Sequence, residues 1–125
     1  MRERARFLNV DLDLKSRAEI TPLIEALKPS VMVLHQGQRR ATLELLKQPA
    51  SAEQAVRQFI NQVEGLSPPI RAVWQRCTRR VLSIGLQSGS TPHQLVIPLA
   101  PTVLSRLAIL SLGIEIVMYA VPRTE

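Results

Sequence analysis

The sequence predicts an α+β fold: a mainly antiparallel sheet with helices packed on one face, in an elaborated ferredoxin-like arrangement. Three observations support this class. Apolar and polar residues alternate over residues 6–14, apolar stripes at helical spacing lie between short strands, and a Gly-containing connection at residues 36–39 favours a hairpin. The expected order is β-α-β-β-α-β-β-α-β, and 125 residues suffice for a single α+β domain over positions 1–125.

The first two elements are a strand over residues 6–14 and a helix. The apolar positions of the strand, which we expect to face the core, are Leu8, Val10, Leu12 and Leu14. The helix should have Thr21 as its N-cap and Pro22 as its first residue, and it should end at Lys28-Pro29.

Two strands and a long helix follow. Residues 31–35 and 40–46 have the composition and short connection of a hairpin. Ser51 and Gln54 form a capping-box pattern that starts the helix, and Gly65 is its expected C-cap.

The C-terminal half continues with helices and strands. We expect a short helix over residues 70–77 and strands over residues 80–87, 94–99 and 114–121. A further helix should begin at Pro101 and end with Gly113 as its C-cap. Its expected inward residues are Val103, Leu104, Leu107 and Ala108.

The bulk composition bounds the class of protein. A formal charge of +6 is within the range that keeps small domains soluble. Cys77 is the single cysteine and no apolar signal segment follows the charged N-terminus, so we expect a cytoplasmic protein. Prolines and charges interrupt the most apolar stretch, residues 95–121, which argues against a membrane span.

The sequence offers little for catalysis. Cys77 and either His35 or His93 would form a nucleophilic pair only if the fold brought them together. Arg76, Arg79 and Arg80 near Cys77 would lower the pKa of its thiol, but a buried cysteine beside the single tryptophan is the favoured interpretation. No phosphate-binding loop or GxSxG motif is present, so we expect no enzyme, no cofactor and no metal.

Acidic residues gather on one side of the first strand. Asp11 and Asp13 share a strand face, and with Glu44 or Glu115 from another strand they would form an oxygen site for Mg²⁺ or Ca²⁺. A solvated sheet face, or a face paired with arginines, is the favoured alternative.

Basic residues form two clusters, Arg39-Arg40 at the hairpin tip and a second one within residues 71–80. The second cluster consists of Arg71, Arg76, Arg79 and Arg80. They would contact the phosphates of a nucleic acid, but aromatics are only 3% of the chain and none is interleaved for stacking on bases. Nucleic-acid binding is therefore the less favoured hypothesis.

Four short segments carry a resemblance to a known family. They are Asp11-Leu12-Asp13-Leu14 with Ser16, the Leu43-Glu44-Leu45 strand, Trp74 followed by Arg80 and Ser83-Ile84-Gly85, and Leu107-Ala108 leading to Ile114, Ile116 and Tyr119. The chain resembles a family of small bacterial α+β proteins of unknown function, some of which look like immunity proteins or accessory factors beside toxin systems. The resemblance implies no catalytic residues.

The hypothesis that these observations favour is a non-enzymatic interaction protein with a protein partner. Either the basic cluster at residues 71–80 or a polar sheet face would meet that partner. The expected polar face consists of Asn9, Asp11, Asp13, Glu44, Glu115 and Tyr119. An exposed sheet edge would also allow a homodimer.

Overall fold

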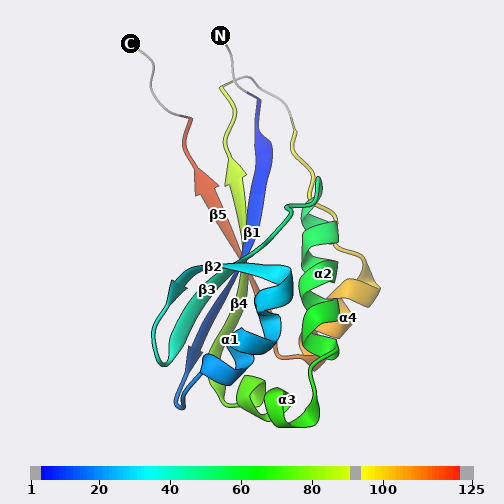
Figure 1. Cartoon of the computed structure of the whole chain (residues 1–125). Helices are drawn as coiled ribbons and strands as arrows, with labels where there is room; N and C mark the ends of the chain where they lie inside the picture. Colours follow the sequence, from blue (N-terminus) through cyan, green and yellow to red (C-terminus); the bar gives the residue numbers. More distant parts are fainter. Residues whose placement is uncertain (1–3, 91–93, 122–125) are drawn as a thin grey trace.

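The computed structural model describes residues 4–90 and 94–121 (Figure 1). The strands are β1 (Arg6–Ser16), β2 (Val31–Gln36), β3 (Arg40–Leu45), β4 (Cys77–Gln87) and β5 (Gly113–Tyr119). The helices are α1 (Thr21–Leu27), followed by the 3-10 turn η1 (Lys28–Ser30), then α2 (Ala52–Glu64), α3 (Pro68–Gln75) and α4 (Pro101–Ile109).

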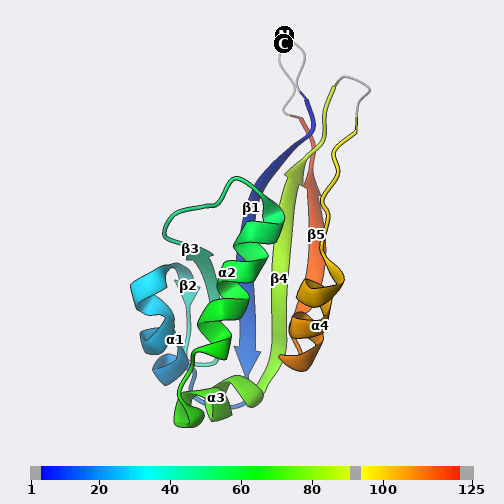
Figure 2. The same cartoon turned by 90° about the vertical axis from the view of Figure 1, so that its right-hand side faces the viewer.

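The five strands form one sheet in the order β2-β3-β1-β4-β5. All neighbouring strands are antiparallel except β4 and β5, which are parallel. Figure 2 shows α1, α2 and α4 in front of the sheet, with α3 across one end. The predicted α+β class and mostly antiparallel sheet are confirmed, whereas this strand order does not confirm the ferredoxin-like arrangement.

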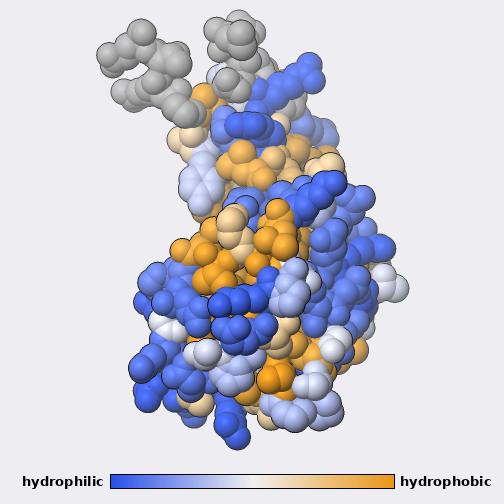
Figure 3. Space-filling model, in the orientation of Figure 1, coloured by the Kyte–Doolittle hydropathy of each residue, from blue (hydrophilic) through white to orange (hydrophobic). Residues whose placement is uncertain are grey.

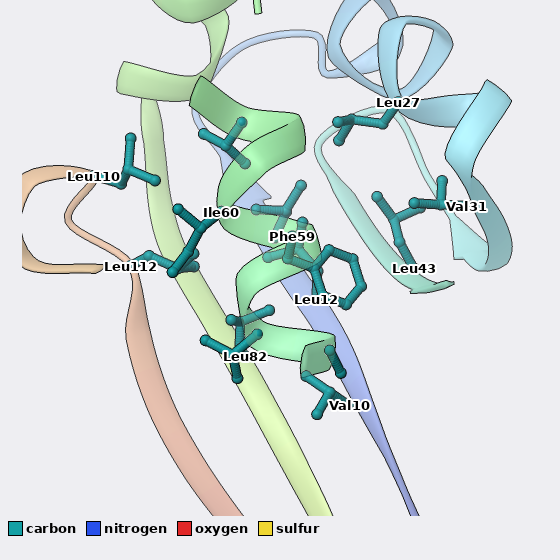
Figure 4. Packing of buried hydrophobic residues seen from close by; sticks show 14 of the residues in the cluster. Val10, Leu12, Leu27, Val31, Leu43, Phe59, Ile60, Leu82, Leu110 and Leu112 are labelled. Carbon is teal, nitrogen blue, oxygen red and sulfur yellow. The ribbon is translucent and has the colours of Figure 1, made fainter. Parts of the chain in front are cut away.

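The core lies between α2 and the middle of the sheet. Val10, Leu12 and Leu14 on β1 have no exposed surface, and neither do Phe59 and Ile60 on α2. Figure 4 shows Val10 and Leu12 close to Phe59 and Ile60. Each such side chain contributes about 1.5 to 3 kcal/mol through burial. The helix begins as predicted, because the Ser51 side chain accepts a hydrogen bond from the backbone N–H of Gln54. It ends at its predicted C-cap, Gly65.

A bulge near the start of β1 changes which residues face the core. Phe7 pairs with Leu86 of β4, but the next pair along the strand joins Asn9 to Gly85, so Leu8 is the inserted residue. Phe7 therefore packs against the core, and Leu8 is not among the side chains that do so. The prediction that Leu8 shares the inward face was wrong because a bulge shifts the period of two by one residue.

The predicted strand over residues 94–99 is also wrong. Among the described residues, 94–100 run without strand pairing to α4. A single helical crossover consequently joins β4 to β5, and such a crossover returns the chain in the same direction, which makes these two strands parallel.

Two predicted helices differ in detail from the structure. The N-cap of α1 is Ile20 and no side chain caps it, although Pro22 occupies the first turn as expected. On α4, Leu104 is 48% exposed and Ala108 is exposed, so only Val103 and Leu107 of the four predicted residues are buried.

The end of α4 is formed by Ser111 and not by Gly113. The N–H of Ser111 donates to the carbonyl of Ala108 at 3.0 Å, and the N–H of Leu112 donates to the carbonyl of Leu107 at 2.9 Å. These two bonds define a Schellman motif, with Ser111 in the left-handed region at a φ of 53°. Gly113 instead begins β5.

Candidate functional site

The sheet has one face that no described helix covers, which we call the open face. The helices pack against the side that carries Val10, Leu12 and Leu14, so alternate residues of each strand point the other way. These open-face residues include Asn9, Asp11, Asp13, Lys15, Thr42, Glu44, Arg79, Val81, Ser83, Gly85, Glu115, Val117 and Tyr119. The six residues predicted for a polar sheet face all lie on it.

Strand register places the acidic residues in one row across this face. Asp11 on β1 lies opposite Glu44 on β3 and opposite Ser83 on β4. Ser83 in turn lies opposite Glu115 on β5. Like charges directly across a strand pair repel each other, so each carboxylate needs compensation.

Arg79 compensates two of the acids. Its Nε lies 2.6 Å from Asp13 Oδ2, and its Nη2 lies 3.2 Å from Glu115 Oε2. Thr42 Oγ1 also donates to Asp13 at 3.4 Å, and Ser83 Oγ donates to Glu115 at 3.3 Å. These bonds hold the pKa of Arg79 above its usual value. The prediction of a face paired with arginines is confirmed for Asp13 and Glu115.

Asp11 and Glu44 have no such cation among residues 4–90 and 94–121. Within the described part of the chain, the hydrogen-bond donor to Asp11 is the side-chain amide of Asn9, at 3.1 Å. Partial burial raises the pKa of Asp11 to about 6; repulsion from Glu44 and a hydrogen bond to it add to the rise, and the Asn9 bond opposes it. The pair therefore carries negative charge to which no described cation is bonded.

The same acids are the candidate ligands of the predicted Mg²⁺ or Ca²⁺ site. Across residues 4–90 and 94–121, no group of three or more His, Cys, Asp or Glu side chains is arranged to hold an ion. The hypothesis of a Mg²⁺ or Ca²⁺ site built on Asp11 and Asp13 gains no support from the geometry.

Gly85 shapes the open face beside the Asp11–Glu44 pair, and the sequence alone did not single it out for that role. A Cβ at Gly85 would overlap Asn9 Oδ1 and would lie 3.5 Å from the ring of Tyr119. The missing side chain therefore lets Asn9 lie flat across β4, where its amide reaches Asp11. The β1–β4 register, which pairs Asn9 with Gly85, is the signal that identifies it.

The predicted arginine cluster is split between two sides of the sheet. Arg79 lies on the open face, whereas the next residue, Arg80, points toward the helices. Arg80 donates to the backbone carbonyls of Cys77 at 2.6 Å, Trp74 at 3.1 Å and Ser111 at 3.1 Å. Its guanidinium also lies 5.9 Å from the centre of the Trp74 ring. Arg80 thus ties α3 to the end of α4.

The other two members of that cluster differ in their surroundings. Arg71 donates to the carbonyl of Glu64 at 3.3 Å and lines a small hollow of about 190 Å³ together with Arg80. Arg76 is exposed just before β4. The four arginines therefore do not form one phosphate-binding surface.

Cys77 is a buried core residue. Its side chain is 5% exposed, and its thiol lies 3.7 Å from the carbonyl oxygen of Val73. Burial raises the pKa of this thiol, and Arg80 opposes that rise only in part. His35 lies on β2, three strand spacings or roughly 14 Å away, and His93 lies outside the described residues. His35 and Cys77 do not form a catalytic pair.

No described helix combines the length and the apolar composition needed to cross a lipid bilayer. A scan against models of protein families found no match to the chain, and searches of curated proteins and of solved structures found none either. The resemblance to the small bacterial family stays a prediction.

Proposed function

We propose that this chain is a non-enzymatic binding protein whose open face takes a protein partner with a basic surface. The observation that carries the proposal is the Asp11–Glu44 pair. Both carboxylates are half-buried and face each other across β1 and β3, and Asp11 lacks the cation that Asp13 and Glu115 share. A lysine or arginine from a partner would supply it.

A protein partner fits the face better than a small ligand does. Five strands give a broad surface whose backbone is fixed by the sheet. Apolar side chains flank the acids: Met32 on β2, which lies opposite Glu44, is 47% exposed, and Tyr119 on β5 is 53% exposed. Aromatic and methionine side chains around a few charges are typical of protein interfaces.

The apolar rim continues to one edge of the sheet. Figure 3 shows apolar side chains gathered on the surface over β2, where Leu34 is 48% exposed. Contact with this rim would remove water from Asp11 and Glu44, which strengthens their attraction to a cation. A desolvated ion pair beside apolar contacts supports selective binding.

An acidic face that captures a basic protein suits the immunity or accessory role that the family resemblance implies. The one cysteine, Cys77, is a free, buried thiol, which suits the reducing cytoplasm where we propose that the protein acts.

A photo-crosslinking amino acid placed at Thr42 in the native host tests the proposal, because Thr42 lies on the open face opposite Asp13 and two residues along β3 from Glu44. The control carries the same amino acid at Gln58, which is exposed on α2 on the opposite side of the protein. We expect one discrete adduct from Thr42 that is absent from Gln58. The added substitutions Asp11→Asn and Glu44→Gln should reduce that adduct strongly. Equal adducts at both positions, or none at Thr42, would contradict the proposal.

A further inference from the structure

Basic residues that are distant in the sequence converge at one end of the sheet, at the bottom of Figure 1. The backbone N–H of Ser16 donates to the carbonyl of Arg39 at 2.7 Å, which brings the β2–β3 hairpin against the end of β1. Ser16 also pairs with Cys77 at the start of β4, next to Arg76. We call the resulting group the basic end; it consists of Lys15, Arg17, Arg39, Arg40 and Arg76.

Two hollows open on either side of Thr78 within this end. One, of about 630 Å³, is lined by Lys15, Arg39 and Arg40, with polar neighbours that include Ser16 and Gln38. The other, of about 480 Å³, is lined by Arg17 and Arg76 with Gln75. No carboxylate lines either hollow. The surface is therefore positive without internal compensation.

The five cations also lack partners of their own. Among residues 4–90 and 94–121, none of their side chains donates a hydrogen bond or forms an ion pair. Arg4 and Lys47 are the other described cations in this state. The cations that do have partners are Arg6, Lys28, Arg57, Arg71, Arg79, Arg80 and Arg106. Five of the seven described cations without a partner thus lie at the basic end, where their positive charges repel one another.

We propose that the basic end binds the phosphate backbone of double-stranded nucleic acid. Its cations come from three separate segments of the chain and surround two hollows, so they suit several phosphates better than a single one. The hydroxyl of Thr78 and the amide of Gln38 add the neutral donors that commonly contact phosphate oxygens.

A duplex fits this end better than a single strand. Recognition of unpaired bases relies on exposed aromatic side chains for stacking. Trp74, the nearest aromatic by sequence to Arg76, is 2% exposed, and Tyr119 pairs with Gln87 at the far end of β4. The contact is therefore electrostatic and independent of base sequence.

Other polyanions fit less well. Binding to an anionic membrane is usually strengthened by apolar side chains that insert, and binding to an acidic protein by apolar anchors. None of the large exposed apolar side chains of the described chain lines either hollow. The acidic row on the open face would repel phosphates, so the duplex touches the end of the sheet, where Lys15 and Arg40 mark the limit of the open face, and stays clear of Asp11 and Glu44.

Fluorescence anisotropy with a short mixed-sequence DNA duplex at low salt tests this inference, with duplex RNA, the single strands and anionic phosphatidylserine vesicles as parallel probes. The test variant combines Arg39→Gln, Arg40→Gln and Arg76→Gln. The control combines Lys28→Gln, Arg57→Gln and Arg106→Gln, which removes equal charge from cations that have partners. Thermal unfolding verifies that both variants fold.

We expect the wild-type chain and the control to bind both duplexes, and the test variant to lose about tenfold or more in affinity at low salt. The slope of log affinity against log salt should fall by up to about 3 in the test variant only. Equal losses in the two variants, tighter binding of single strands, binding of vesicles without binding of duplex, or no binding at low salt would each overturn the inference. None of these outcomes affects the crosslink at Thr42, so the two proposals fail independently.

Discussion

At the scale of single residues, Asp11 links the stability of the fold to pH. Its pKa of about 6 in the folded chain is above the ordinary value of 3.8. Between these two pH values the folded protein keeps a proton that the unfolded chain has lost. The contribution of this group to the free energy of unfolding is therefore full below about pH 4, falls as the pH rises to about 6, and stays low above it.

Replacing Asp11 with Asn should remove the fall in the free energy of unfolding that its ionisation causes. We expect Asp11→Asn to increase the free energy of unfolding at neutral pH by about 1 to 2 kcal/mol, and to have little effect near pH 4. Urea unfolding of both proteins at about pH 4 and about pH 7.5 measures the difference. Glu25→Gln, which alters an exposed ion pair with Lys28, is the control. A stability difference independent of pH would contradict this role of Asp11.

Gly85 is the second residue with a specific structural requirement. Gly85→Ala should destabilise the fold by about 1 kcal/mol, because the new methyl group overlaps Asn9 Oδ1 and the Asn9 side chain must rotate away at the cost of its bond to Asp11. Asn9→Ala removes the overlapping atoms, so the double variant should be more stable than Gly85→Ala alone. Chemical denaturation of the two single variants and the double variant tests this as a double-mutant cycle. Additive losses would show that Asn9 is not the obstacle.

At the scale of elements, the end of α4 contains a residue poorly suited to its backbone. Ser111 adopts a φ of 53°, where glycine is favoured. Ser111→Gly should therefore stabilise the protein by about 0.5 to 1 kcal/mol. Ser105→Gly, within α4, should destabilise it by a similar amount because glycine weakens a helix interior. Thermal or urea unfolding compares them, and shifts of the same sign would contradict the assignment.

Local patterns predicted most elements, because each has a local cause. The alternation in β1 and the Ser51 cap of α2 both depend on residues close in sequence. The position of Leu8 could not be predicted, because the bulge appears only when β1 pairs with β4. Strand pairing also determines the conformation of residues 94–99. Their apolar composition suits a strand, but no described strand pairs with them.

The candidate site was predictable to the same extent. A period of two places Asp11 and Asp13 on one face from the sequence alone. The register between strands decides that Asp13 meets Arg79 and that Asp11 meets Glu44. Asp13 therefore lies in an ion pair, whereas Asp11 faces another carboxylate. The basic end was harder still, because Arg39 and Arg76 become neighbours only through the fold.

At the scale of the whole molecule, the charge of +6 is divided into regions of opposite sign. The open face carries the acidic row, and the end of the sheet carries unpaired cations. This division underlies the two proposals, a basic protein at the open face and a nucleic-acid backbone at the basic end.

The edge strand β5 gives a prediction for assembly. No strand in the described part of the chain lies along its outer edge, and Ile116 and Met118 are 55% and 58% exposed. We expect a homodimer in which two β5 strands pair, and size-exclusion chromatography with light scattering measures its mass. Ile116→Lys should yield monomer, while Ile109→Lys, at a position 79% exposed on α4, should not. A monomeric wild-type chain at high micromolar concentration would refute the dimer.

The most direct test of the proposed function is carbodiimide labelling of carboxylates in the free chain and in the complex captured through Thr42. If a partner's cation binds between Asp11 and Glu44, these two residues should lose most of their labelling in the complex, while the labelling of exposed Glu25 should not change. Unchanged labelling of Asp11 and Glu44 in the complex would show that the partner binds elsewhere and would contradict the proposed function.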